Sequence, residues 1–479
     1  MYDCIIIGAG ISGCSMAFEL SKQKGSILLL DKENDIAVGT TKANSAIIHA
    51  GYDPMSETKM AKYNVEGNKI IPQLCKDLDV PIKNIGSLVV AFCEEEVKTL
   101  HELLQRGEKN GVLGMRIIEA EELHEMEPNL NEHAVAALYA PSACIVNPWD
   151  LAIAYAETAV KNGVEFKPNQ DVIKIEKTEN GFVVETKTDK FETKTIVNAA
   201  GVQCDQILGM VTKPDYEIQP NKGEYYLLDK SQGSLVNHVI FQCPTKEGKG
   251  VLVAPTVHGN LIVGPSSGTS DEDDVSTTQN GLDMIKTAAL KSVPSINFRE
   301  NIRTFAGIRA RRKDHGDFVV GEHPEVNGFF QIAAMQSPGL SSASAIAVDM
   351  VKRFQEKGLF TEVKEHPITT RKVVRFKEMS TEERMEYIKE HPAYGRIICR
   401  CETISEGEIL DAIHRVIQPV SIDGVKRRCN AGMGRCQGGF CGPRVQELIA
   451  RELDISQEKV VQDKAGSVIL YHKTKEGER

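Results

Sequence analysis

Two groups of residues in this 479-residue chain have the types and spacing that cofactor chemistry requires: a cluster of cysteines and a run of glycines. Five of the 12 cysteines fall between positions 399 and 441, and four of them form a C-x-C pair and a C-x4-C pair. These four are Cys399, Cys401, Cys436 and Cys441. Four thiolates suit a tetrahedral zinc ion or a [2Fe–2S] cluster. The cysteines scattered from Cys4 to Cys243 are expected to be small core side chains.

The glycine run lies near the N-terminus and reads Gly8-Ala9-Gly10-Ile11-Ser12-Gly13. A predicted strand (residues 4–7) precedes it, a predicted helix (12–22) follows, and a second strand (26–30) ends on Asp31. This order of strand, turn, helix, strand and acid is typical of a dinucleotide-binding βαβ unit. The helix N-terminus attracts the pyrophosphate, and the acid accepts hydrogen bonds from ribose hydroxyls. The motif by itself fits FAD and NAD equally.

Composition and charge narrow the class of protein. The chain has 41% hydrophobic and 26% charged residues, as soluble globular proteins do. Its net charge of −10 argues against broad binding of nucleic acid or an anionic membrane, so an anionic substrate must meet local basic groups. No stretch approaches the roughly 18 apolar residues of a transmembrane helix, and no signal-peptide pattern is present. We therefore expect a cytoplasmic protein without a direct membrane span.

The elements that must position these groups alternate between strands and helices. The spacing of apolar residues predicts helices at 94–110, 148–162 and 341–356, a strand hairpin across 166–186, and strands through 224–263. Such alternation is typical of an α/β protein.

The character of the chain changes after residue 356. Residues 357–392 are charged and poor in large apolar side chains, which predicts a linker. The cysteine-bearing region is expected to form a small domain at 393–452, followed by a tail at 453–479. Helices are predicted in these segments at 381–389, 405–416 and 443–453.

Ordered segments across residues 2–356 resemble the FAD-dependent oxidoreductases of the D-amino-acid oxidase and glycerol-3-phosphate dehydrogenase group. Besides the glycine run, they are Gly39-Thr40-Thr41-Lys42-Ala43-Asn44-Ser45-Ala46-Ile47-Ile48-His49-Ala50-Gly51, Val197-Asn198-Ala199-Ala200-Gly201, Gly248-Lys249-Gly250-Val251-Leu252-Val253-Ala254-Pro255-Thr256, Ala306-Gly307-Ile308-Arg309 and Ser337-Pro338-Gly339-Leu340-Ser341. The resemblance implies FAD as the cofactor. It also implies a Rossmann-like FAD-binding domain (about 1–75, 145–215 and 300–356) interleaved with an α+β mixed-sheet substrate domain (about 76–144 and 216–299).

The resemblance also implies residue roles at the flavin. The run from Thr40 to Ser45 would lie along the diphosphate and the ring, through Thr40, Thr41, Asn44 and Ser45. Val172 would contact the adenine, and the helix beginning at Gly339-Leu340-Ser341 would direct backbone N–H groups at the flavin N1 and O2 side. The remaining residues implied to contact FAD are Gly8, Gly10, Ile11, Ser12, Gly13, Asp31, Lys32, Gly201 and Gly307.

On the substrate side, His49 is the expected base. Its segment resembles the one in which the glycerol-3-phosphate oxidase and L-2-hydroxyglutarate dehydrogenase branch places a histidine by the flavin. Lys249 and Arg309 are the expected cations for an anionic substrate. Two cations and a histidine suit glycerol 3-phosphate, a 2-hydroxy dicarboxylate or an amino acid. Three further cations are secondary candidates for this role, and we expect them to be surface charges rather than ligands: Lys222, Arg311 and Arg312.

Residues 397–450 resemble the bacterioferritin-associated ferredoxin-like [2Fe–2S] domain, which is small and mainly helical. This resemblance favours [2Fe–2S] over zinc, and it carries over to the four cysteines of the two pairs. Cys429 stands where the pattern more often has threonine, so we do not expect it to be a ligand, although it could be an alternative one. Four cations would offset the negative charge of the cluster: Lys426, Arg427, Arg428 and Arg435.

Together the resemblances imply a dehydrogenase that oxidises glycerol 3-phosphate to dihydroxyacetone phosphate by hydride transfer to FAD. Electrons would leave through the [2Fe–2S] centre to an acceptor protein or a partner flavoprotein subunit. The alternatives are an L-2-hydroxyglutarate or other 2-hydroxy-acid dehydrogenase, an amino-acid dehydrogenase, and a non-catalytic electron-transfer subunit. No nucleic-acid partner is expected, and any association with a membrane would be peripheral, through a partner.

Overall fold

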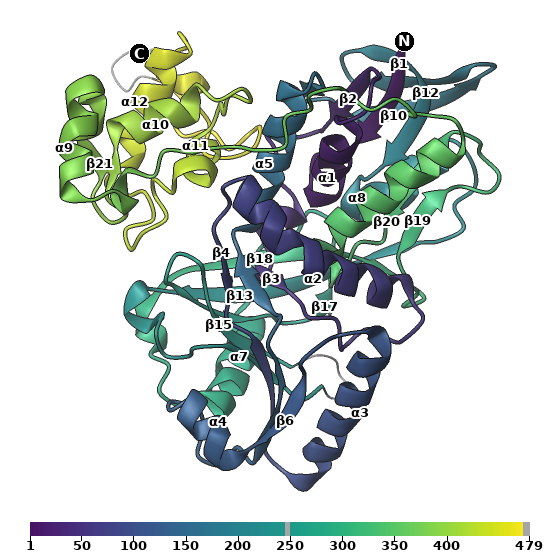
Figure 1. Ribbon diagram of the computed structural model, residues 1–479. Helices are drawn as coiled ribbons and strands as arrows, with labels where there is room; N and C mark the ends of the chain where they lie inside the picture. The colour runs from purple at the N-terminus through teal and green to yellow at the C-terminus, as the bar shows by residue number, and fades with distance from the viewer. Residues whose placement is uncertain (245–249, 473–479) are drawn as a thin grey trace.

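The computed structural model describes residues 1–244 and 250–472, which form three parts (Figure 1). Two of them are interleaved along the chain, and each is built on one large β-sheet. The third part is a small helical domain near the C-terminus, drawn in yellow-green beside the first part in Figure 1. This arrangement confirms the expected mixed α/β fold with a mainly helical C-terminal domain.

The first sheet carries the glycine run at the end of its central strand. Its strand order is β10-β11-β12-β1-β2-β9, and β20 pairs with both β12 and β19. The strands are β1 (Tyr2–Ile7), β2 (Ile27–Leu30), β9 (Glu165–Lys167), β10 (Val172–Thr178), β11 (Gly181–Thr186), β12 (Lys190–Asn198), β19 (Val319–Glu322) and β20 (Phe329–Ala333). From β20 through β12, β1 and β2 to β9 the pairing is parallel. Parallel strands are buried on both faces, which explains the nearly unbroken apolar runs of β1 and β2.

Helices cover one face of this sheet. They are α1 (Ile11–Leu20), α5 (Pro148–Lys161) and α8 (Gly339–Glu356), with α2 (Lys59–Asp77) packed on α8. The contact between α2 and α8 requires a glycine, because a Cβ at Gly67 would lie 1.8 Å from the carbonyl oxygen of Ser341. The short helix α6 (Cys204–Gly209) belongs to a separate apolar cluster of the same part, centred on residues such as Phe329.

The second sheet is mixed and forms the lower part of the molecule in Figure 1. Its order is β17-β13-β16-β15-β14-β5-β7-β6, with β18 along β13. The strands are β5 (Ser87–Ala91), β6 (Arg116–Glu119), β7 (Ala136–Ala140), β13 (Ile218–Leu228), β14 (Val239–Gln242), β15 (Leu252–Pro255), β16 (Leu261–Gly264), β17 (Gly268–Thr269) and β18 (Asn301–Arg312). Three helices pack on it: α3 (Glu94–Asn110), α4 (Ala120–Met126) and α7 (Gln279–Ser292).

A small antiparallel sheet accompanies the two large ones. It pairs β3 (Ile47–Ile48) and β4 (Ile82–Asn84) with β8 (Cys144–Val146). β3 precedes His49 directly, and β8 leads into α5 through Asn147, whose side chain accepts a hydrogen bond from the backbone N–H of Asp150 at 3.0 Å. The small sheet therefore fixes two chain segments that reach the functional site.

The C-terminal domain has its own apolar core, in which Ile409, Val425 and Ile449 are fully buried. Its elements are α9 (Thr381–Glu390), β21 (Ile397–Cys399), β22 (Ile404–Ser405), α10 (Glu406–Ile413), α11 (Ile422–Cys429) and α12 (Gly442–Glu452). Ser405 and Glu408 form a reciprocal capping box that starts α10.

The segments expected as a linker and a tail are packed against the rest of the protein. Arg371, in the linker, is 4% exposed and donates to Asp150 at 2.8 Å and to Glu157 at 3.2 Å on α5. Beyond α12, Val460 is fully buried, and the backbone N–H of Ile422 donates to the carbonyl of Val461 at 3.1 Å. The described residues after 453 thus belong to the C-terminal domain and do not form a separate tail.

The predicted helices at 94–110, 148–162 and 341–356 are present as α3, α5 and α8. The hairpin across 166–186 is wrong at its start, because β9 separates from it and pairs with β2. The sequence analysis missed α2, α4, α6, α7 and α11. Pro72 lies inside α2, and a proline usually interrupts a helix. Within the described residues, no helix combines the length and apolarity needed to cross a bilayer.

Candidate active site

One large cavity, of about 710 Å³, runs between the two sheets and the C-terminal domain. Its walls include the glycine run, the segment 39–47, much of β18, and the start of α8 at 337–340. The volume lies in the usual range of small-molecule and cofactor sites. The cavity therefore joins nearly all the segments that the sequence analysis associated with FAD.

The glycine run makes a turn that only small residues allow. Gly8 has a φ of +105°, and a Cβ there would lie 2.4 Å from the carbonyl oxygen of Ala199. A Cβ at Gly13 would lie 1.8 Å from the carbonyl oxygen of Gly8, so α1 can sit close to β1 only with glycine there. The backbone at the start of α1 is thus open to the cavity, which fits a diphosphate group.

Asp31 ends β2 and holds the turn. Its carboxylate accepts from the backbone N–H groups of Ala9 at 2.6 Å and Glu33 at 2.8 Å. Burial raises the pKa of Asp31 to about 6. Asp31, Lys32 and Val172 all line the cavity, as expected for the end that would hold the adenosine.

The segment after Gly39 is held against β18. Thr40 Oγ1 donates to the carbonyl of Ile308, and a Cβ at Gly307 would lie 1.9 Å from the carbonyl oxygen of Ala43. Thr41 Oγ1 accepts from the backbone N–H of Ile11 at 2.9 Å, which links this segment to α1. The other predicted flavin contacts of this region also line the cavity: Asn44, Ser45, Gly201, Gly339 and Leu340. Ser341 is buried behind it.

His49 lines the same cavity, and its backbone is fixed from two helices. Its N–H donates to Ser341 Oγ at 2.8 Å, and its carbonyl accepts from Asn64 at 2.6 Å and Asn68 at 3.2 Å. The imidazole ring lies 5.8 Å from the ring of Phe241, centroid to centroid. Asn64 and Asn68 were missed by the sequence analysis because α2 was not predicted. They are two buried amides one helical turn apart.

Arg309, one of the two predicted substrate cations, lines the cavity. Its Nη1 donates to Asn221 Oδ1 at 2.6 Å, and its Nη2 donates to the carbonyl of Ser266 at 3.4 Å. Among residues 1–244 and 250–472, no carboxylate forms an ion pair with Arg309, so its charge is available to an anion. Lys249, the second predicted cation, lies outside the described residues.

Two of the three further cations, Lys222 and Arg312, pair with carboxylates. Lys222 was expected to be a surface charge, but its side chain is 11% exposed and pairs with Asp274 at 2.6 Å. The guanidinium of Arg312 pairs with Asp314, two residues further on.

His258 is a cavity residue that the sequence analysis did not single out. It lies in the turn between β15 and β16, and its Nε2 is 3.1 Å from Asn147 Nδ2. Burial lowers the pKa of His258 to about 4. The imidazole is therefore neutral near pH 7. The sequence carried no signal for it, because its burial depends on the packing of β8 against this turn.

The four predicted ligand cysteines form two pairs. Cys401 Sγ and Cys436 Sγ are 3.6 Å apart. The thiol of Cys441 hydrogen-bonds to Cys399 and thereby lowers the pKa of Cys399. Two thiolates on one tetrahedral metal with bonds of about 2.3 Å lie about 3.7 Å apart.

The four thiols lie in two pairs. In the part of the chain that the structure describes, no group of three or more His, Cys, Asp or Glu side chains lies together as a metal site. Two pairs with two sulfurs each match a [2Fe–2S] cluster, in which each iron takes two protein ligands. Cys429 stands apart: its thiol is 3.4 Å from the carbonyl of Val425, and burial raises its pKa to about 12.

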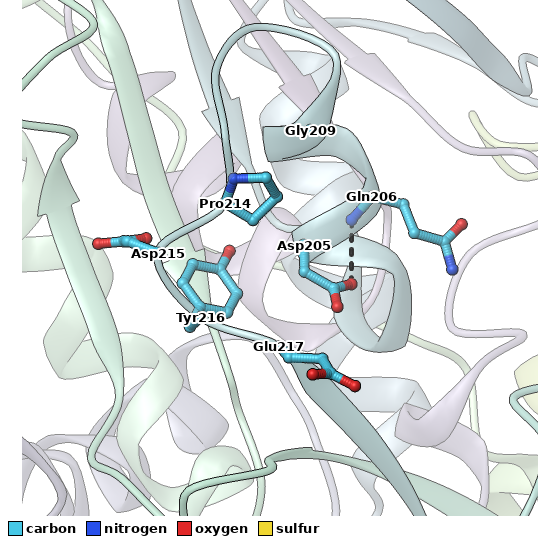
Figure 2. Close-up of a pocket in the computed structure, with 7 residues that line it drawn as sticks. All are labelled: Asp205, Gln206, Gly209, Pro214, Asp215, Tyr216 and Glu217. Carbon is cyan, nitrogen blue, oxygen red and sulfur yellow. Dashed lines mark hydrogen bonds between the residues drawn. The ribbon is translucent and has the colours of Figure 1, made fainter.

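A smaller indentation lies outside this site, between α6 and the start of β13 (Figure 2). It is lined by Asp205, Gln206, Gly209, Pro214, Asp215, Tyr216 and Glu217. Figure 2 shows Asp205 accepting a hydrogen bond from the backbone of Gln206, at 2.9 Å. The indentation holds none of the predicted functional residues.

Comparisons with known proteins cover both parts of the chain. Residues 3–353 match the model of the FAD dependent oxidoreductase family, and residues 397–451 match the BFD-like [2Fe-2S] binding domain. The chain is 47% identical to a glycerol 3-phosphate dehydrogenase of Caloramator mitchellensis, over 99% of both proteins. It is 35% identical to a glycerol 3-phosphate oxidase of Mycoplasma genitalium, over 72% of this chain and 92% of the oxidase.

Two solved structures show the same fold. The dithionite-reduced L-α-glycerophosphate oxidase of Mycoplasma pneumoniae, with FAD bound, aligns with a TM-score of 0.73 at 30% identity, over 78% of this chain and 99% of the oxidase. A glycerol-3-phosphate dehydrogenase of Bacillus halodurans, complexed with FAD, aligns with a TM-score of 0.65 at 15% identity, over 96% of this chain and 92% of that one. Together with the cavity and the cysteine pairs, these matches identify FAD and a [2Fe–2S] cluster as the cofactors.

Proposed function

The chain belongs to the FAD-dependent oxidoreductase family, and on this premise we propose that it oxidises glycerol 3-phosphate to dihydroxyacetone phosphate and passes the electrons through its [2Fe–2S] domain to a partner. The observation that carries the proposal is the meeting of His49 and Arg309 with the glycine turn in one cavity. FAD, when bound there, supplies a two-electron acceptor for a hydride from the substrate carbon.

The proposed role of Arg309 is to hold the phosphate. A guanidinium presents a planar fork of donors that suits a phosphate or carboxylate, and its present partners, Asn221 and the Ser266 carbonyl, are neutral. Asn221 keeps the guanidinium oriented without neutralising its charge. Lys249 is proposed as the second cation, on the strength of the sequence resemblance alone.

The proposed role of His49 is to take the proton of the substrate hydroxyl as the hydride leaves the carbon. The hydrogen bonds from Asn64 and Asn68 and the one to Ser341 hold its backbone, so the ring position is set by three side chains on α2 and α8. The N-terminus of α8 is proposed to favour negative charge in the neighbouring part of the cavity through its free backbone N–H groups.

The C-terminal domain is proposed to be the exit for electrons. Glu402 and Gln437 follow Cys401 and Cys436 directly in the sequence, and both line the cavity. Each cysteine of this pair is therefore the direct sequence neighbour of a residue that lines the cavity. The acceptor is proposed to be a partner protein or a partner flavoprotein subunit.

Anaerobic stopped-flow absorbance tests the proposal. The purified protein, loaded with both cofactors, is mixed separately with glycerol 3-phosphate, L-2-hydroxyglutarate and a panel of amino acids, and flavin bleaching is followed. Rapid bleaching by glycerol 3-phosphate alone is the expected result. Bleaching by L-2-hydroxyglutarate instead would reassign the substrate. This compound is included because the chain is 32% identical, over 56% of its length, to a protein named L-2-hydroxyglutarate dehydrogenase. Bleaching by none would favour an electron-transfer subunit.

A further inference from the structure

Part of the large cavity is built by the C-terminal domain. Asp423, Lys426 and Arg427 of α11, Gln437 of the cysteine loop, and Asp463 and Lys464 all line it. These residues lie outside 3–353, the range that matches the FAD family, and Asp463 and Lys464 lie outside the [2Fe-2S] domain match as well. The FAD cavity therefore has a wall, here called the C-terminal wall (residues 423–437 and 463–464), that neither family match assigns to flavin.

An ionic bridge connects this wall to the segment that lies along the cavity. Lys42, between Thr41 and Ala43, pairs with Asp463. The same carboxylate accepts from Arg427 Nη1 at 2.7 Å. Asn34 donates to the backbone carbonyl of Asp463 at 2.8 Å. Residue 463 is thus joined to both the first sheet domain and α11.

Behind the bridge, one buried carboxylate locks the two domains together. Asp35 is 1% exposed and accepts from Arg428 Nη1 at 2.8 Å, from Arg428 Nη2 at 2.7 Å and from Arg427 Nη2 at 3.1 Å. The guanidinium of Arg428 has no exposed side-chain surface. Buried charges of this kind are tolerated only while they are paired and hydrogen-bonded, so separating the domains here would take Asp35 and Arg428 away from each other, while Arg427 would keep Asp463.

The other end of the wall is fixed to the second sheet. Lys230 pairs with Glu402 at 2.8 Å, and Arg435 pairs with Glu300 at 2.7 Å. Arg303 of β18 donates to Gln437 at 3.4 Å. The wall is therefore attached to both interleaved domains, on either side of the cavity.

The match to one oxidase relative leaves more than a quarter of this chain uncovered. The match to the Mycoplasma genitalium protein covers 92% of that protein but only 72% of this chain. The part of this chain left unmatched is about as long as the segment that follows α8.

We propose that the FAD site of this protein is shared between two domains: the C-terminal wall closes over bound FAD, and FAD exchanges only when that wall moves. The [2Fe–2S] domain then has a second role, as the cover that retains the flavin. This inference requires that FAD binds, but it does not depend on which substrate is oxidised.

Hydrogen exchange on the full-length, cluster-loaded protein tests the proposal without any mutation. Amide exchange is measured by mass spectrometry with and without FAD. We expect FAD to slow exchange at least several-fold in the peptides covering 422–437 and 460–467, as well as in 8–14 and 39–45. Helix α3 (Glu94–Asn110), which lies outside the cavity, serves as the internal control. Protection confined to residues before 357 would overturn the proposal.

Two variants then test the lock from opposite sides. Asp35→Asn removes the shared carboxylate, and Arg428→Met removes its main partner from α11; neither residue lines the cavity. Release of bound FAD into an excess of labelled FAD should become roughly tenfold faster or more in both variants, while the iron and sulfide contents of Asp35→Asn stay at the wild-type value. Glu452→Gln breaks an exposed pair with His414 in the same domain and should leave release unchanged.

The outcomes are distinct. Wild-type release rates in both variants, together with faster amide exchange at 422–437, would show that the wall had opened without freeing FAD and would overturn the proposal. If a variant fails to fold, the hydrogen-exchange comparison of the unmodified protein with and without FAD decides whether the wall covers the flavin. Because no arm uses substrate, failure of the proposed glycerol 3-phosphate activity would leave these results unaffected.

Discussion

Arg309 and Asn221 face each other across the paired strands β18 and β13, with Arg309 Nη1 2.6 Å from Asn221 Oδ1. A neutral partner orients the guanidinium and leaves its charge for a ligand. Replacing Arg309 by Met should lower kcat/KM for glycerol 3-phosphate roughly 10- to 100-fold, since a hydrogen bond to a charged group contributes about 1.5–3 kcal/mol. Steady-state kinetics measure this, and Lys313→Met, at an exposed ion pair with Glu217, is the control. Equal kinetics in the two variants would exclude Arg309 from phosphate binding.

The hydrogen bonds that join His49 to Ser341, Asn64 and Asn68 use its backbone atoms, so a change of its side chain leaves these three bonds in place. His49→Asn should retain FAD but slow flavin reduction by substrate about 10²- to 10⁴-fold, the usual contribution of a general base. Single-turnover bleaching of the flavin measures the rate. If substrate reduces the flavin of the variant as fast as that of the parent protein, His49 is not the base.

The two kinds of cysteine offer a matched pair of variants. Cys436→Ser should abolish the visible absorption and electron paramagnetic resonance signal of the cluster while sparing flavin reduction. Cys429→Ser should keep both, because the Cys429 thiol contacts the Val425 carbonyl and stays protonated. Iron and sulfide analysis checks both variants. Full iron in the first, or loss of iron in the second, would require a different ligand set.

Arg371 is the centre of a buried ionic group that ties the segment after α8 to α5. Replacing it by Met leaves Asp150 and Glu157 buried with weaker compensation. Loss of one partner of such a pair costs about 3–5 kcal/mol, so the free energy of unfolding should fall by that amount. Denaturant titration followed by circular dichroism measures it. Lys372→Met, at the exposed neighbouring position, should behave like the parent protein.

Acid should weaken the attachment of the C-terminal wall. Although burial opposes the shift, the charges of Arg427 and Lys42 lower the pKa of Asp463 to about 2. A carboxylate whose folded pKa is below its unfolded value of about 3.8 stabilises the fold above pH 4 and loses that contribution as the pH falls toward 2. The contribution is about 2 kcal/mol from the size of the shift. Thermal unfolding from pH 6 to pH 2.5 should therefore show a steeper loss in the parent protein than in Asp463→Asn.

The sequence was most informative where local chemistry determines structure. Gly8 and Gly13 are required by contacts within one βαβ unit, and Cys399 and Cys401 are two residues apart, so both motifs were recognisable before folding was considered. Helices α3 and α5 were predicted for the same reason, because their apolar spacing is regular.

Residues whose role depends on distant packing were not predictable. Asn64 and Asn68 act through α2, whose internal Pro72 obscured the helix. His258 becomes buried only when the turn after β15 meets Asn147, and Lys222 is covered only by its ion pair with Asp274. Asp35 shows no signal at all in the sequence, since its two arginine partners lie nearly 400 positions further along the chain.

The interleaving of the two sheets also determines the order in which the protein can assemble during synthesis. β1 emerges from the ribosome first, but it pairs with β12, so that Tyr2 lies opposite Thr193. β12 in turn pairs with β20, where Ile196 lies opposite Phe329. Contacts this far apart in the sequence form slowly, because a long loop must close before any stabilising contact is gained. Asp35 obtains its partners only after Arg428 has been made. In the nascent chain this side of the cavity therefore stays uncovered until Arg428 and Asp463 have been made, which leaves a period in which FAD could enter before the C-terminal domain docks.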